Sequence, residues 1–318
     1  MNYERIYTYY NEALELYHGR ICKSPRMAII YVTYACNFSC EGCLCRDYRF
    51  ENSFMSLEQF KQVTLQLKKQ GVKSIELCGG GEPLIHPDIK EMITYVTDTL
   101  HMSIGVMTNS SMLNDHLSYL LATRANYVRT SFYEERFDEV LEKVRKLIAI
   151  KEKVAGRPVI GAKFLVTEDN QEFVMPHLKK IIAIPGFNYI SLKARRGYGK
   201  AYDVSSLEEE IRQLGDDRIH ATLKDTRLCG HCWMTPIHTL IDPYGDVYIC
   251  CYYMGRETEH RIGNVFEQPF SEIWGSQEHL NKLRSIDPAK CNVFDCRWHV
   301  YNQKMSELLN NDLLHEFC

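Results

Sequence analysis

Between residues 27 and 196 the sequence alternates short apolar segments with amphipathic ones, and this alternation restricts the fold most. Strands are expected at 27–33, 72–78, 103–108, 127–132, 159–166 and 189–193, with helices at 56–70, 87–100, 115–122, 137–153 and 172–184. Strands that alternate with helices build a parallel sheet with helical crossovers. The predicted fold class is α/β, a partial (β/α)6 TIM-like barrel with its chemistry in the loops after the strands.

Outside this region the sequence no longer alternates strands with helices. Residues 1–26 are expected to form an N-terminal extension with one short helix, and the barrel is expected over 27–225. Over 226–302, short strands, a tight turn at 242–246 (DPYGD) and several cysteines predict a small C-terminal domain that needs a metal for its stability. Residues 303–318 are expected to be a tail or a final helix.

The chain has 13 cysteines, and most of them fall into two sets. The first residues lack the apolar core of a signal peptide, so we expect a cytoplasmic protein, in which clustered cysteines are typical of metal or redox sites. Two inorganic sites are therefore predicted, one from each set: Cys36, Cys40, Cys43 and Cys45, and then Cys229, Cys232, Cys250, Cys251, Cys291, Cys296 and Cys318.

Composition limits the possible partners. The 318 residues carry a formal net charge of −3, with 45% hydrophobic and 25% charged residues, which is typical of a globular protein. This charge gives no general attraction to nucleic acid or to anionic lipid. The longest apolar runs, such as 27–32, are far too short to span a bilayer. We expect no nucleic acid and no membrane as a partner.

Cys36-x3-Cys40-x2-Cys43 follows the first expected strand, in a loop that can wrap three thiolates around an iron–sulfur cluster. Three ligands leave one iron open, as in catalytic metal sites. A structural zinc site with Cys45 as fourth ligand is the alternative. The motif resembles the signature of the radical S-adenosylmethionine (radical SAM) enzymes. In that family the open iron binds SAM, and the 4Fe–4S cluster generates a 5′-deoxyadenosyl radical that takes hydrogen from the substrate.

A glycine-rich segment strengthens this resemblance. Gly79-Gly80-Gly81-Glu82-Pro83 follows the second expected strand and resembles the family's segment that contacts the amino group of SAM. Glycines permit positive φ and a close backbone approach, which leaves carbonyl groups available to an ammonium group.

The resemblance also implies SAM contacts at the ends of later strands, from Asn109, Ser131 and Asn170. Two positions depart from the family pattern. Ser110 stands where a glycine is usual after Asn109, and Gly42 stands where an aromatic residue often packs near the adenine. Adenine stacking is therefore expected from other rings, Phe38 or Tyr48.

The late cysteines are expected to converge through a hairpin whose turn lies at 242–246, because its two arms lie side by side. Cys229 is an alternative to Cys232 as the thiol before the hairpin. The pattern resembles the auxiliary-cluster domain called twitch, the shorter relative of the SPASM domain. The resemblance implies one auxiliary 4Fe–4S cluster with four thiolate ligands: Cys232, Cys250, Cys291 and Cys296.

Two clusters suggest a radical reaction in which the second cluster accepts an electron or anchors the substrate. The twitch resemblance favours aminocyclitol and sugar-alcohol dehydrogenases. The first hypothesis is thus oxidation of a secondary alcohol in such a small molecule, with an external electron donor such as flavodoxin or ferredoxin. A base must take the hydroxyl proton, and the candidates are Lys163, Lys193, Arg195 and His238.

Three alternatives remain. An epimerase would return hydrogen to the opposite face from a thiol, Cys251 or Cys78. A ribosomal-peptide (RiPP) maturase would cross-link or epimerise a peptide substrate, although 26 residues before the first strand are expected to be too few for the leader-binding domain of many such enzymes. A non-catalytic zinc scaffold would explain the cysteines, but it would explain neither the glycine segment nor the barrel.

Overall fold

The computed structural model describes residues 8–40, 43–48, 53–167, 170–194, 196–197, 200–201, 206–222, 231–291, 296 and 298–309. These residues form one ten-stranded sheet in the order β12-β11-β10-β1-β2-β3-β4-β5-β6-β9. Its consecutive parallel strands are β1 (Met27–Ile30), β2 (Ser74–Leu77), β3 (Ser103–Thr108), β4 (Tyr127–Phe132), β5 (Val159–Val166), β6 (Tyr189–Ala194) and β9 (Ile219–Thr222).

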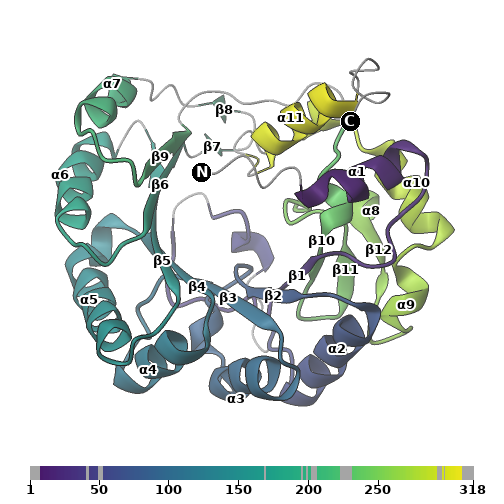
Figure 1. Cartoon of the computed structure of the whole chain (residues 1–318), viewed down its shortest axis with the longest axis horizontal. Coiled ribbons are helices and arrows are strands. Elements are labelled where there is room, and N and C mark those ends of the chain that lie inside the picture. The colour runs from purple at the N-terminus through teal and green to yellow at the C-terminus, as the bar shows by residue number, and fades with distance from the viewer. Residues whose placement is uncertain are drawn as a thin grey trace.

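Helices cover the convex side of this curved sheet, which forms an incomplete ring (Figure 1). Crossovers between the strands contain α2 (Leu57–Gln70), α3 (Ile89–Thr94) with a π-helical turn η4 (Tyr95–Thr99), α4 (Asp115–Arg124), α5 (Phe137–Lys153), α6 (Gln171–Ile182) and α7 (Ser206–Gln213). Short helical turns lie at η2 (Arg46–Tyr48), η3 (Pro83–Ile85) and η5 (Glu134–Arg136), and β7 (Arg196–Gly197) pairs with β8 (Lys200–Ala201). The partial barrel expected from the sequence is confirmed.

The C-terminal part continues the barrel sheet. Here β10 (His238–Ile241) pairs in parallel with β1, and β11 (Asp246–Tyr248) and β12 (Arg261–Asn264) follow antiparallel. Around them lie α1 (Tyr10–Tyr17), η6 (Thr235–Ile237), α8 (Glu257–His260), α9 (Phe270–Ile273), α10 (Gln277–Ser285), η7 (Pro288–Lys290) and α11 (His299–Leu309). The cysteine-rich region therefore shares backbone hydrogen bonds with the barrel through the pairing of β1 with β10.

Local sequence signals account for several boundaries. Helix α2 begins at a capping box between Ser56 and Gln59 and ends at Gly71, whose φ of 106° is left-handed. Two expectations need correction. The barrel contains a seventh parallel strand, β9, beyond the six expected strands, and the final helix, α11, begins at His299 rather than after residue 302.

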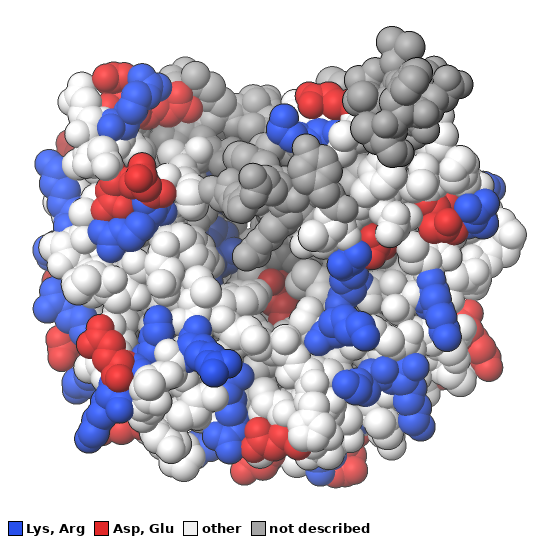
Figure 2. Space-filling view, viewed as in Figure 1, with Lys and Arg blue, Asp and Glu red and all other residues white. Residues whose placement is uncertain are grey.

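Side chains on the strands alternate between the helices and the concave face. In β4, Val128 and Phe132 are buried against the helices, whereas Tyr127 and Arg129 lie half-buried on the opposite face. A Cβ on Gly105 would lie 2.1 Å from the ring of Tyr127, so glycine is required on β3 for this ring to lie flat on the sheet. Figure 2 shows a hollow in the face seen in Figure 1, with acidic and basic side chains inside it.

Among the described residues, no helix is both long enough and apolar enough to cross a bilayer.

Candidate metal centres and cofactor site

The three early cysteines lie in the loop between β1 and α2. Cys36, Cys40 and Cys43 are all half-buried, and the Cys43 amide donates to the Cys40 carbonyl (3.3 Å). The hydroxyl of Tyr133, directly after β4, hydrogen-bonds to Cys40 and interacts electrostatically with Cys43 and Cys36. Burial and these sulfurs raise the pKa of Tyr133 well above its usual range. The thiols therefore face one common volume, which fits a cluster with three cysteine ligands.

The glycine-rich segment after β2 packs directly on the cysteine loop. The amide of Gly81 donates to the carbonyl of Thr33, and the amide of Glu82 donates to the carbonyl of Ala35, both at 2.9 Å. A Cβ on Gly81 would lie 1.8 Å from the Ala35 oxygen, and Gly80 has a φ of +84°. Glycine is thus required at both positions, because only glycine lets this backbone approach the loop.

Glu82 and Pro83 link neighbouring strands. The buried Glu82 carboxylate accepts hydrogen bonds from the Leu84 amide (3.0 Å), the Thr108 hydroxyl (2.6 Å) and the Asn109 amide (2.7 Å). Burial raises the pKa of Glu82 to about 7, although these three donors favour the charged form. Pro83 begins η3. The Glu82 side chain ties the end of β2 to the end of β3, and the contact of this segment with SAM stays a prediction.

Asn109 holds the cysteine loop from β3. Its Nδ2 donates to Asn37 Oδ1 (3.0 Å), and its Oδ1 accepts from the amide (2.9 Å) and hydroxyl (2.7 Å) of Ser111. Ser110 occupies the position where the family usually has glycine, and its φ is +59°. The hydroxyl of Ser110 pairs with that of Thr130 (2.8 Å). Asn109 therefore positions the cysteine loop, and its contact with SAM stays a prediction.

The other predicted residues lie along the concave face and its edge. Ser131 is half-buried and in register with Lys163 on β5, and Lys193 is half-buried on β6. The side-chain amide of Asn170 bonds to backbone groups of the preceding turn (2.8 and 2.9 Å), so it fixes the start of α6. Arg195 lies outside the described residues.

The two rings expected near the adenine make contacts within the protein. Phe38 is 8% exposed, packs edge-on against Tyr133 (5.9 Å between ring centroids) and has Arg136 over its face (5.0 Å). Tyr48 stacks on Tyr34 (5.5 Å). Their part in adenine binding stays a prediction.

The four late cysteines predicted as ligands come together. Burial first, and then the nearby thiol of Cys291, raises the pKa of Cys232. Burial and then Cys232 raise the pKa of Cys296 to about 12, with smaller effects from Cys251 and Cys291. A hydrogen bond with Cys251 and burial raise the pKa of Cys250, and the nearby thiol of Cys296 raises it further. Each of the four thiols is thus near enough to another to affect its pKa, and a set of four neighbouring cysteines fits an iron–sulfur cluster. Cys229 lies outside the described residues.

Three further thiols surround a buried tyrosine between the two sets. Cys251 (8% exposed), Cys45 (5%) and the half-buried Cys78 pack near Tyr31. Burial and these thiols raise the pKa of the Tyr31 hydroxyl well above its usual range. Cys251, expected as a hydrogen donor, thus packs in the same buried cluster as Cys45 and Tyr31 and is adjacent to Cys250 in sequence.

Residues 229–297 match the SPASM iron–sulfur cluster-binding domain, and residues 30–147 match the radical SAM superfamily. The chain belongs to the radical SAM superfamily. As a radical SAM enzyme it uses SAM and a 4Fe–4S cluster, and its SPASM region carries auxiliary iron–sulfur chemistry. The early thiols fit the SAM-binding cluster and the late thiols fit the auxiliary cluster, because the thiols of each set lie near one another.

Two kinds of curated radical SAM relative are similar to the chain. Mycofactocin maturase MftC of Mycolicibacterium smegmatis is 25% identical over 305 residues, which cover 84% of this chain and 75% of that protein. MftC of Mycobacterium tuberculosis is 23% identical over 303 residues, with the same coverage. A probable GTP 3′,8-cyclase of Saccharolobus solfataricus is 23% identical over 203 residues, which cover 58% of this chain and 64% of that protein.

Solved structures share the radical SAM fold. Streptococcus suis SuiB bound to precursor peptide SuiA has a TM-score of 0.63 at 16% identity, over 87% of this chain and 70% of SuiB. The enzyme anSMEcpe with bound AdoMet and Kp18Cys peptide has a TM-score of 0.61 at 14% identity, over 88% of each chain. BtrN in complex with AdoMet and 2-DOIA has a TM-score of 0.50 at 15% identity, over 83% of this chain and 88% of BtrN.

Two tyrosines around this radical SAM site, Tyr34 and Tyr133, were not predicted as site residues. Tyr34 is buried in the same cluster as Cys45, Cys251 and Tyr253, and its hydroxyl forms a hydrogen bond with that of Tyr253. Tyr133 reaches the early thiols from a different strand end. The signal of Tyr34 and Tyr133 was weak, because buried tyrosines usually belong to the core.

Proposed function

We propose that the chain is a radical SAM maturase that modifies a ribosomally made peptide. The observation that carries this proposal is the similarity to mycofactocin maturases, which covers 84% of the chain and therefore both cysteine regions. SuiB and anSMEcpe, which share the fold, bind peptides in their solved structures. The oxidation of a sugar alcohol, favoured by the motifs, has less support. The likenesses to SuiB, anSMEcpe and BtrN, at 14–16% identity, are all of fold alone, whereas the sequence similarity over most of the chain is to the mycofactocin maturases.

When bound, SAM and its cluster supply a radical that removes hydrogen from a carbon of the substrate. The residues of the chain that bind and orient the substrate must then lie on the concave face. Arg129, Lys163 and Lys193 lie half-buried there, on three neighbouring strands. Cationic side chains on β4, β5 and β6 suit a substrate rich in carbonyl and carboxylate oxygens, such as a peptide. Proton removal by Lys193 or by Arg195 is part of this proposal.

The C-terminal centre is proposed to have one of two roles. It anchors the peptide, or it accepts an electron from it. Tyr34 and Tyr253 are fully buried and leave no open face for a substrate, so we place its entry at the hollow seen in Figure 2. Cys251 is 8% exposed, which makes hydrogen donation to a bulky radical the less favoured variant. Flavodoxin or ferredoxin is the proposed electron donor, in the cytoplasm.

The test is anaerobic incubation of the iron-loaded enzyme with SAM, a reductant and synthetic copies of short peptides encoded beside its gene. We expect a peptide product with a changed mass, formed together with 5′-deoxyadenosine that carries deuterium from a labelled peptide. The triple variant C36A/C40A/C43A is the control and should leave the peptide unchanged. Oxidation of an aminocyclitol, with no change in any peptide, would overturn the proposal in favour of the small-molecule reaction.

A further inference from the structure

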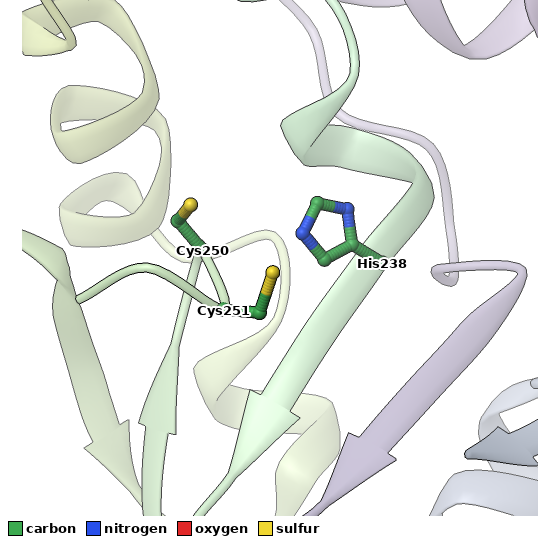
Figure 3. Close-up of side chains that lie close together, drawn as sticks. All are labelled: His238, Cys250 and Cys251. Atoms are coloured by element: carbon green, nitrogen blue, oxygen red, sulfur yellow. The ribbon is translucent and has the colours of Figure 1, made fainter. Parts of the chain in front are cut away.

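We propose that His238 is an iron ligand of the auxiliary centre, which therefore has mixed cysteine and histidine ligation. His238 is the first residue of β10, and it lies opposite the end of β11 that leads to Cys250 and Cys251. The ligand atoms of these three residues all lie within 4.8 Å of one another (Figure 3). The sequence suggested His238 as a base facing the substrate, but the ring is fully buried beside the late thiols.

The hydrogen bond of the ring fixes which nitrogen is available. His238 Nδ1 lies 3.1 Å from the backbone carbonyl of Met234. A carbonyl oxygen only accepts, so Nδ1 carries the hydrogen, and Nε2 of the neutral ring presents a lone pair. Histidines that ligate metals usually donate their other N–H to a carbonyl or carboxylate in this way. The ring is thus already in the tautomer that a metal ligand needs.

The free lone pair points toward sulfur. His238 Nε2 is buried and has no hydrogen-bond partner among the residues that the structure describes. Figure 3 shows this nitrogen facing the sulfurs of Cys250 and Cys251. A buried polar atom without a partner is costly, and coordination to iron would satisfy it.

The ring is also held in place. His238 is in parallel register with Met27 of β1, and the Trp298 ring lies 5.2 Å from the imidazole. A ligand on an interior strand of the sheet is positioned by the fold itself, because β10 is hydrogen-bonded to a strand on each side. Because a cluster of four irons that binds His238 has room for only three thiolates, two of the five cysteines near this centre must stay unbound; the five are Cys232, Cys250, Cys251, Cys291 and Cys296.

Ligation by imidazole changes the properties of the centre. A neutral imidazole replaces a negatively charged thiolate, so the net charge of the cluster becomes less negative and its reduction potential rises, as in other mixed-ligand iron–sulfur centres. Such a centre accepts an electron more readily than one with four cysteines.

The inference is tested on the auxiliary centre alone, without any peptide. The C36A/C40A/C43A protein is produced once with 14N-histidine and once with 15N-histidine. Both samples are loaded with iron anaerobically, reduced and compared by pulsed electron paramagnetic resonance. We expect the hyperfine coupling of a directly bound histidine nitrogen, lost in His238→Gln and kept in His279→Gln. His279 is a matched control because it is also buried, and its described ring contacts are the Gly275 amide (3.1 Å) and Trp274.

Two outcomes would overturn the inference: no strongly coupled histidine nitrogen in the labelled protein with His238 intact, or a coupling that survives in His238→Gln. If His238→Gln fails to assemble the centre, His238→Cys replaces it, because it keeps a metal-binding side chain. That variant should lose the nitrogen coupling and shift the reduction potential downward. None of these measurements requires the proposed peptide reaction, so failure of one proposal leaves the other testable.

Discussion

The hydroxyl of Tyr34 donates a hydrogen bond to Asp242 Oδ2 at 3.1 Å, across 208 residues of sequence. Tyr34 begins the loop with the early cysteines, and Asp242 begins the turn of the hairpin between β10 and β11. The same hydroxyl pairs with that of Tyr253, just after Cys250 and Cys251. A single buried side chain therefore links the SAM-cluster loop to the auxiliary region.

Tyr34→Phe should loosen this link. The change removes the hydroxyl that Asp242 and Tyr253 share in a buried site, at a cost of about 1–3 kcal/mol. We expect the apparent Tm of the anaerobic, iron-loaded protein to fall by roughly 2–5 °C. Tyr244→Phe is the control, because Tyr244 is 46% exposed, and it should leave Tm nearly unchanged. Equal losses in the two variants would contradict the role given to Tyr34.

Gly81→Ala should displace the early cysteine loop. The new Cβ would lie 1.8 Å from the Ala35 oxygen, so one of the two backbones has to move. We expect the reconstituted Gly81→Ala variant to hold about half of the iron of the wild type, because it loses the early cluster and keeps the auxiliary cluster. Gly79→Ala is the matched control: its Cβ would meet only the Tyr31 hydroxyl, at 3.9 Å. Full iron content in Gly81→Ala, measured by a colorimetric assay, would refute this packing.

Ser110 should tolerate glycine better than alanine. Its φ of +59° strains any residue with a side chain, while its hydroxyl bonds to Thr130. Ser110→Gly loses the bond but relieves the strain, so stability should change by less than about 1 kcal/mol. Ser110→Ala loses the bond, keeps the strain and should cost about 1–2 kcal/mol. Thermal denaturation checks the order, which would be reversed if the backbone were relaxed there.

Glu82 should make stability depend on pH. Burial raises its pKa from 4.5 to about 7. Between these values the unfolded chain has lost the proton that the folded protein keeps, so the free energy of unfolding falls as pH rises. The loss approaches about 3 kcal/mol above pH 7. Glu82→Gln removes this titration, so the stability of the variant relative to wild type should improve from pH 5 to pH 8. A difference that is independent of pH, or that reverses, would contradict the assignment.

Much of the fold could be predicted because local signals and tertiary structure agree. The segments 103–108 and 127–132 have the apolar, β-branched pattern of strands, and β3 and β4 have these bounds. Strand β9 escaped prediction because Ile219–Thr222 is short and its pairing with β6 is set by the barrel. The continuation of the sheet through β10 is likewise a long-range pairing that no local pattern specifies.

The candidate site, like the fold, could be predicted only in part. Cysteine spacing predicts which thiols gather, because a short loop or a hairpin brings neighbours together whatever surrounds them. The role of Glu82 in tying β2 to β3, and the burial of His238, depend on residues far away in sequence. Such roles emerge only once the strands are in register.

The early thiols are expected to hold a cluster with one iron open to SAM. The most direct measurement is the electron paramagnetic resonance spectrum of the reduced, anaerobically prepared protein with and without SAM. We predict that SAM alters the spectrum of the wild type and leaves that of the C36A/C40A/C43A variant unchanged. A wild-type spectrum that SAM does not alter would contradict the account.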